Sequence, residues 1–336
     1  MTFGERGKAR GLLVGDVHQG IRQMFHVIEQ ARMGVGIKSV ATLSSAYLHA
    51  LEYSKERVQG PDLKRAMDKT APRVTILHHP DVRRMLMEQK CHVEGMRALV
   101  LFTASVQEQV EILGGHAAQQ AKELDALNDF LLPLVKGYSS EKAYELLAVS
   151  LQCLGGSGYV QDYPIEQYVR DQKIDSLYEG TTHIQALDLI LRKIAKDGGA
   201  TMQGLLGKMT QTVLDQVGGE TLATERQLLD RAIKDVQGTF GALMGKFGES
   251  IYHVGLQGNR ILFAVAELVI GWLLVRHAGL AVEKLPAAQG PDRAFYEGKI
   301  ASAQYYCRNT LPKLTLTRKL VEAGTLDLMN LSEDAF

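Results

Sequence analysis

The chain has 336 residues, with 38 acidic and 38 basic side chains and a formal net charge of zero at pH 7. This balance gives no reason to expect binding to nucleic acid or to an anionic membrane. The three cysteines, Cys91, Cys153 and Cys307, are far apart and odd in number, which argues against a disulfide framework. The first residues contain no apolar core of the kind a secretory signal requires, so we expect a cytoplasmic protein.

The N-terminal half is expected to form a helical bundle. Residues 12–14 are apolar and predict one short β-strand with no neighbour beside it. From about residue 20 the apolar residues recur at a helical period, and this first helix should end near residue 60. Further helices are predicted over residues 80–113, 116–135 and 139–154, with a polar connection between the first two. Four long amphipathic helices with short links indicate an antiparallel bundle.

The C-terminal half is also expected to be helical. A short helix is predicted over residues 164–170, and a second one follows residues 181–182 and ends at residues 197–199. The remaining helices are predicted over residues 202–217, 220–247, 251–285 and 292–324, which is long enough for a second helical domain with its own core. The apolar run at residues 261–275 contains Glu267 and is shorter than the roughly 20 residues that cross a bilayer, so we interpret it as a buried helix. The predicted fold class is therefore all-α.

One carboxylate stands at the entrance of a predicted helix, in the stretch Y-E-G-T-T-H-I-Q at residues 178–185. Glu179 precedes Gly180, and Thr181 or Thr182 is suited to cap the helix that follows. Desolvation beside apolar neighbours can raise the pKa of such a carboxylate, which a general base acting on a weak carbon acid needs. The alternative is that Glu179 only occupies a helix start, where acidic residues are common.

A glycine cluster, residues 155–158, follows the fourth predicted helix. It lacks the G-x-G-x-x-G spacing and does not follow a strand, so it is not a dinucleotide fingerprint. Gly155 and Gly156 could let backbone N–H groups approach a phosphate, with Gln152 as a further donor, or could form a plain interhelical turn. Arg57 ends the first helix and suits a pyrophosphate, or simply complements the negative end of its own helix.

An arginine and several histidines are further candidates for ion pairs or ligands. Arg32 shares a helix face with apolar residues, and a charge in that position needs a partner, most simply a carboxylate. The His78–His79 pair has no matching second pair, and His116 and His183 are expected to be packing or surface groups. No metal site is therefore expected.

Together these residues resemble the acyl-CoA dehydrogenase family, in particular its large bacterial members with an extra C-terminal helical domain. The most specific segment is LQCLGGSGYVQDYPIEQYVRDQKIDSLYEGTTHIQ, and matching segments extend over essentially the whole chain. The resemblance implies a remnant of the middle β-domain at residues 1–17, the C-terminal helical bundle domain at 18–198 and the additional helical domain at 199–336. Family members also place an N-terminal helical domain and a β-domain ahead of this region, and those supply most contacts to the flavin ring.

The resemblance also implies a reaction, the α,β-dehydrogenation of a fatty acyl-CoA to the trans-2-enoyl-CoA. The glutamate of the YEGT motif removes the α-proton while the β-hydrogen leaves as hydride to flavin N5, and this role falls on Glu179. Some relatives carry their base on the first helix, at the position of Ala31 here, so Glu29 is only a weaker candidate.

The expected cofactor is FAD. The resemblance assigns the FAD of a neighbouring subunit to Arg57, Gln152, Gly155 and Gly156, and the FAD beside Glu179 to Thr181. Arg32, Tyr178 and Gly180 are expected to bind substrate or support the base.

The expected partners are the acyl-CoA substrate, an electron-transfer flavoprotein as electron acceptor, and other subunits. The subunits would form a homodimer or a dimer of dimers, or include a chain that supplies the missing domains. The competing interpretation is a non-catalytic structural or regulatory subunit, or a truncated product, that lacks the flavin seat.

Overall fold

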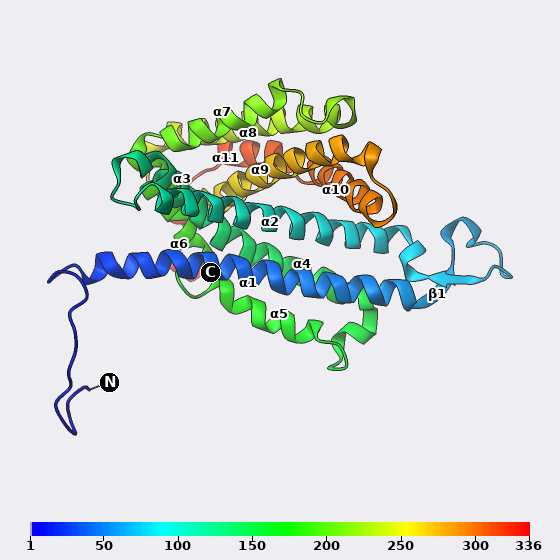
Figure 1. Ribbon diagram of the computed structural model, residues 1–336, viewed down its shortest axis with the longest axis horizontal. Helices are drawn as coiled ribbons and strands as arrows, with labels where there is room; N and C mark the ends of the chain where they lie inside the picture. Colours follow the sequence, from blue (N-terminus) through cyan, green and yellow to red (C-terminus); the bar gives the residue numbers. More distant parts are fainter. Residues whose placement is uncertain (1) are drawn as a thin grey trace.

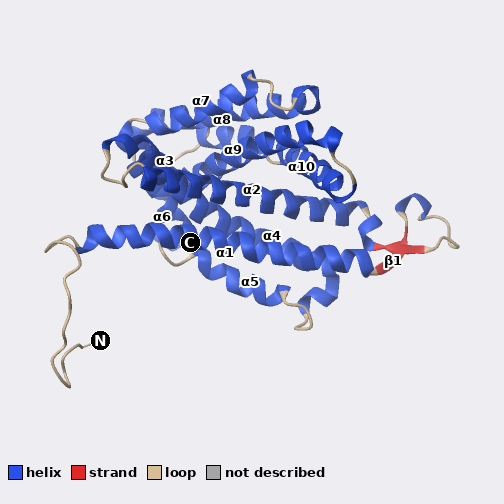
Figure 2. Cartoon of the chain, viewed as in Figure 1, coloured by secondary structure: helices blue, strands red, loops and turns tan. Residues whose placement is uncertain are grey.

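The computed structural model describes residues 2–336, apart from the side chain of Arg22, and most of these residues are helical (Figure 2). The all-α prediction is therefore confirmed. The α-helices are α1 (Gly20–Glu56), α2 (Pro80–Ile112), α3 (Lys122–Pro133), α4 (Ser139–Leu154), α5 (Ile165–Lys173), α6 (Thr182–Leu187), α7 (Ala200–Leu214), α8 (Ala223–Phe247), α9 (Tyr252–Lys284), α10 (Gly290–Asn309), α11 (Lys313–Glu322) and α12 (Asp327–Asn330).

Helix α1 is the longest helix of the described chain and buries an apolar stripe against its neighbours. Its 37 residues rise about 55 Å at the usual 1.5 Å per residue. Buried Val40, Leu43, Ala46 and Ala50 recur every three or four residues and face α2 and α4. The first turns of α1 instead project beyond the other helices (Figure 1).

The short strands lie elsewhere than predicted. Residues 12–14 are exposed and form no strand, so that prediction is wrong: a strand needs a partner, and the structure offers none to this segment. Instead β1 (Val58–Pro61) and β2 (Arg73–Thr75) pair antiparallel within the connection between α1 and α2. These strands are too short to give an alternating apolar pattern.

The two halves of the chain share one hydrophobic core, so the expectation of a separate C-terminal core is wrong. Buried residues of α1 to α4, the helices of the predicted bundle, form a single cluster with buried residues of α8 to α11. Helix α9 packs against α2 so closely that any side chain at Gly95 would collide with Ile270. Figure 1 shows α9 between α2 and the outer layer of α7 and α8. The cysteines are free and buried in this core.

Helix α9 contains the apolar run at residues 261–275. Tyr252–Ala287 is the one segment of residues 2–336 that is long and apolar enough to cross a membrane, but 78% of its most apolar window is buried inside the protein. Trp272 lies in this run, and its indole N–H donates a 2.8 Å hydrogen bond to Thr212 Oγ1 of α7. The run is thus a core helix, as predicted.

Two of the predicted helices have different bounds in the structure. Residues 292–324 form α10 and α11, separated near Pro312, which lacks the N–H that a continuing helix would use. Residues 116–135 become α3, which starts only at Lys122 and passes at Pro133 into a π-helical turn, Leu134–Tyr138. This turn brings Lys136 into the interior.

Glu267 is a partly buried carboxylate on α9, and its ionisation is expected to make stability depend on pH. Burial raises its pKa from 4.5 to about 7, while the positive charges of Lys142 and Lys313 oppose the shift. The folded chain therefore binds this proton more tightly than the unfolded chain. Stability from Glu267 is complete below pH 4.5 and is lost as the pH rises through about 7.

Glutamine at position 267 imitates the protonated acid and removes this dependence. We expect Glu267→Gln to match the parent protein near pH 4.5 and to exceed its free energy of unfolding by about 3 kcal/mol near pH 8, measured by urea titration. Comparing the variant with the parent cancels the contribution of buried His92, whose pKa burial lowers to about 3. Glu283→Gln, at an exposed position of the same helix, is the control and should show no such difference. Equal stability of Glu267→Gln and the parent at both pH values would contradict the prediction.

Candidate active site

The YEGT turn between α5 and α6 holds Glu179 in an unusual backbone conformation. Glu179 has φ +56° and Gly180 has φ +85°, so both lie in the left-handed region. For a residue with a side chain this conformation costs about 1–3 kcal/mol and persists only where the surroundings enforce it. Here Gln185 Nε2 donates to the carbonyls of Glu179 and Gly180 at 3.1 and 3.3 Å.

A buried lysine binds the same turn from the interior of the protein. Lys136 Nζ donates a 2.6 Å hydrogen bond to the Gly180 carbonyl, and the side chain is fully buried. Burial, helped by the positive charge of Arg32, lowers the pKa of Lys136 to about 8, and the negative charges of neighbouring carboxylates that include Glu179 oppose this shift. Sequence reasoning missed Lys136, although a lysine inside the apolar run at residues 130–138 was a usable signal.

The carboxylate itself points away from the core. Glu179 is exposed, and none of four cavities of about 220 to 460 Å³ in the described chain is lined by it. The expectation that residues of this chain desolvate Glu179 is therefore wrong. Around it, however, the segment exposes four large apolar side chains: Ile174, Leu177, Tyr178 and Ile184. An exposed apolar cluster of this kind is typical of a surface that binds an apolar partner.

Arg32 has the carboxylate partner that its position on an apolar face predicted. Its Nη1 lies 2.7 Å from Asp188 Oδ2, and the two side chains are only 12% and 8% exposed. Asp188 follows α6 and also lies 3.8 Å from exposed Arg192. The pair joins α1 to the segment that begins with the YEGT turn. Sequence reasoning had not identified Asp188.

Tyr178 and Thr181 flank Glu179 with polar groups. Desolvation and the charge of Asp175 raise the pKa of Tyr178. Thr181 is the N-cap residue of α6, but its hydroxyl makes no capping bond and is exposed, which leaves it free for a ligand. Thr182 instead donates a 2.7 Å hydrogen bond to Glu141.

A second group of predicted residues lies where α1 ends beside the glycine turn. Tyr53 of α1 donates a 3.2 Å hydrogen bond to Ser157 and so joins the two segments. Arg57 is exposed and has no ion pair among residues 2–336. Gln152 is exposed as well.

The glycine turn leaves room for a ligand. Gly155 has φ +57° and ψ −140°, a conformation for glycine, and a Cβ built on Gly155 or Gly156 would meet no atom within 4 Å. The guanidinium of Arg57, the side-chain amide of Gln152 and the backbone N–H groups of Gly155 and Gly156 are hydrogen-bond donors of the kind that bind an anionic group such as a pyrophosphate. This end of the bundle thus fits the FAD assignment.

The structure does not bring the two groups together. The glycine turn precedes α5, and the YEGT turn follows it, so they lie at opposite ends of this nine-residue helix (Figure 1). Its length alone separates them by about 14 Å. Glu29, the weaker candidate for the base, accepts a hydrogen bond from Asn128 and faces His116.

The chain is similar to known proteins in sequence and in structure. Residues 18–195 match the family model described as "Acyl-CoA dehydrogenase, C-terminal domain", and residues 205–332 match "Acetyl-CoA dehydrogenase C-terminal like". The chain is 53% identical to the broad-specificity linear acyl-CoA dehydrogenase FadE5 of Mycobacterium tuberculosis, over 100% of this chain and 56% of the relative. It is 34% identical to 3-methylmercaptopropionyl-CoA dehydrogenase of Ruegeria pomeroyi, over 91% of this chain and 51% of the relative.

Solved structures show the same fold. The acyl-CoA dehydrogenase of Bacillus anthracis complexed with FAD superimposes with a TM-score of 0.70 at 19% identity, covering 94% of this chain and 52% of that one. The chain spans about half the length of the curated relatives it matches.

Proposed function

Because the chain belongs to the acyl-CoA dehydrogenase family, we propose that it carries the catalytic base of an FAD-dependent fatty acyl-CoA dehydrogenation. Glu179 is that base. The observation that supports this most is its strained conformation, held by Lys136 and Gln185 under an exposed carboxylate. Strain that neighbouring groups enforce is characteristic of functional sites.

Glu179 takes the α-proton of the thioester, and the β-hydrogen leaves with its electron pair, so the saturated acyl group becomes the trans-2-enoyl group. A bound acyl chain would cover the apolar side chains of Ile174, Leu177 and Ile184. Covering them also removes water from around the carboxylate, and an apolar setting of this kind suits a base that acts on a weak carbon acid. The desolvation that the chain lacks by itself therefore comes from the ligand and from the protein surface that closes over it.

FAD, when bound, supplies the acceptor for the hydride. Thr181 would contact the FAD beside Glu179, whereas Arg57, Gln152, Gly155 and Gly156 would hold the FAD of a neighbouring subunit. The separation of the two groups along α5 supports this division, since one flavin site then draws on two chains. A homodimer or dimer of dimers, with an electron-transfer flavoprotein as acceptor, follows from the proposal.

The proposal is tested by spectroscopy of the purified protein with added FAD. We expect an oxidised flavin band that bleaches when a saturated fatty acyl-CoA is added without oxygen, together with enoyl-CoA detected by mass spectrometry. A flavin band that an acyl-CoA does not bleach would contradict the proposed reaction.

One observation favours a second candidate, a non-catalytic subunit. Glu179 is exposed, and none of the four cavities adjoins it. Such a subunit would stay colourless and take up no added FAD, so the same spectrum separates the two candidates.

A further inference from the structure

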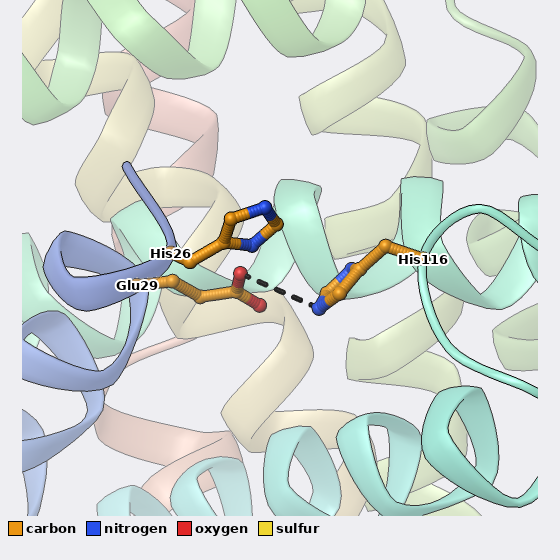
Figure 3. A group of neighbouring side chains, drawn as sticks. All are labelled: His26, Glu29 and His116. Carbon is orange, nitrogen blue, oxygen red and sulfur yellow. Dashed lines mark ion pairs between the residues drawn. The ribbon is translucent and has the colours of Figure 1, made fainter. Parts of the chain in front are cut away.

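Three potential metal ligands converge where the first turns of α1 meet the α2–α3 connection. His26 and Glu29 lie one helical turn apart on α1, and His116 faces them from the connection (Figure 3). One ligand atom from each residue lies within 4.8 Å of the others. None of the three belongs to the proposed catalytic machinery.

His116 and Glu29 each use one polar atom to bind a neighbouring residue outside the cluster. Asp125 Oδ1 lies 2.5 Å from His116 Nδ1, and Asn128 donates to Glu29 Oε1. These bonds turn His116 Nε2 and Glu29 Oε2 toward each other. A carboxylate bound to the far nitrogen of a histidine is the usual outer partner of a metal-ligating imidazole.

The other polar atoms of these two side chains, which face each other, have a spacing that suits a bound ion better than a direct hydrogen bond. His116 Nε2 and Glu29 Oε2 are 3.8 Å apart, too far for a hydrogen bond. Two ligand atoms about 2.1 Å from a tetrahedral zinc ion lie roughly 3.4 Å apart, so this pair needs to close by only a few tenths of an ångström. His26 is exposed, its ring lies 5.4 Å from that of His116 between centroids, and its side chain can rotate to complete the set.

We propose that His26, Glu29 and His116 bind one Zn²⁺ ion, with a fourth position open to water or to Glu111, whose Oε1 lies 3.9 Å from His116 Nε2. Two imidazoles and one carboxylate suit zinc in preference to magnesium or calcium, which take oxygen ligands. The ion joins the projecting first turns of α1 to the α2–α3 connection and so fixes a helix end that few other contacts hold. This departs from the expectation of no metal site, because the third ligand is 87 residues beyond Glu29 in sequence and no short spacing marks it.

The test is calorimetric titration of the chelator-treated protein with Zn²⁺ alone. We expect one equivalent to bind, a higher midpoint of thermal unfolding, and a tetrahedral visible spectrum when Co²⁺ replaces Zn²⁺. His116→Ala and Glu29→Gln should each weaken zinc binding by at least about 100-fold, and Asp125→Asn, which removes only the outer partner, by about 10- to 100-fold.

His49→Ala is the matched control, since His49 is an exposed histidine of the same helix outside the cluster, and it should bind zinc like the parent protein. No uptake of Zn²⁺ by the parent would overturn the proposal. Uptake that His116→Ala and Glu29→Gln leave unchanged would overturn it as well, because the ion would then lie elsewhere.

Discussion

Replacing Glu179 by glutamine is expected to lower the turnover of a saturated acyl-CoA by about 10²- to 10⁴-fold, the usual contribution of a general base. Glutamine keeps the size and polarity of the side chain but cannot accept the α-proton. Because the backbone bonds of the turn come from Lys136 and Gln185, the substitution leaves them in place. Flavin content and KM should therefore stay close to those of the parent, and the loss should fall on kcat.

Steady-state assays with an artificial electron acceptor measure this effect in flavin-containing protein. Glu108→Gln is the control, because Glu108 is an exposed glutamate on α2 far in sequence from the YEGT turn. It should keep the parent rate. A Glu179→Gln variant that keeps more than about a tenth of the parent kcat would remove Glu179 from the mechanism.

The strain at Glu179 offers an independent check on the same role. Glycine adopts φ +56° without steric cost, so Glu179→Gly should raise the free energy of unfolding by up to about 1 kcal/mol while it abolishes turnover. A variant that is more stable but inactive would show that the Glu179 side chain serves the reaction and not the stability of the fold. A stability loss would instead mean that the carboxylate holds the fold.

The helices could be predicted from sequence because their apolar stripes are local patterns. The fourth predicted helix, residues 139–154, coincides with α4, and Pro80 begins α2 as its position at a helix start predicts. The shared core could not be predicted in this way. Whether α9 packs on its own neighbours or on α2 depends on contacts such as Gly95 with Ile270, which are 175 residues apart.

For the candidate site, the sequence motif predicts only which neighbouring residues share a turn. Glu179, Gly180 and Thr181 occupy one turn, as their adjacency requires. The residues that support this turn were not predicted. Lys136 reaches it from a π-helical turn, 44 residues before Gly180, and Asp188 pairs with Arg32 of a distant helix, α1. The exposure of Glu179 was missed for a related reason. Apolar neighbours in sequence, such as Leu177 and Ile184, turned outward with it and did not bury it.

Removing the carboxylate of Asp188 is expected to cost more stability than any other change considered for this chain. Asp188→Ala leaves the largely buried guanidinium of Arg32 without its partner, and its Nε already lacks a hydrogen bond. Breaking a buried pair in this way costs about 3–5 kcal/mol. The Asp129–Lys193 pair has the same 2.7 Å separation, but Asp129 is 47% exposed, so Asp129→Ala should cost less than about 1 kcal/mol. Urea unfolding of both variants measures the contrast.

A double variant separates the unpaired charge from the lost volume as the cause. If the cost of Asp188→Ala comes from a stranded charge, replacing both members by apolar side chains of similar size, Arg32→Met with Asp188→Leu, should recover most of the lost stability. If it comes from a cavity or from a disrupted turn, Arg32→Met should add its own loss to that at position 188, since independent effects sum. Equal costs for Asp188→Ala and Asp129→Ala would show instead that water reaches Arg32 and screens it, and the pair would then contribute no more than a surface ion pair.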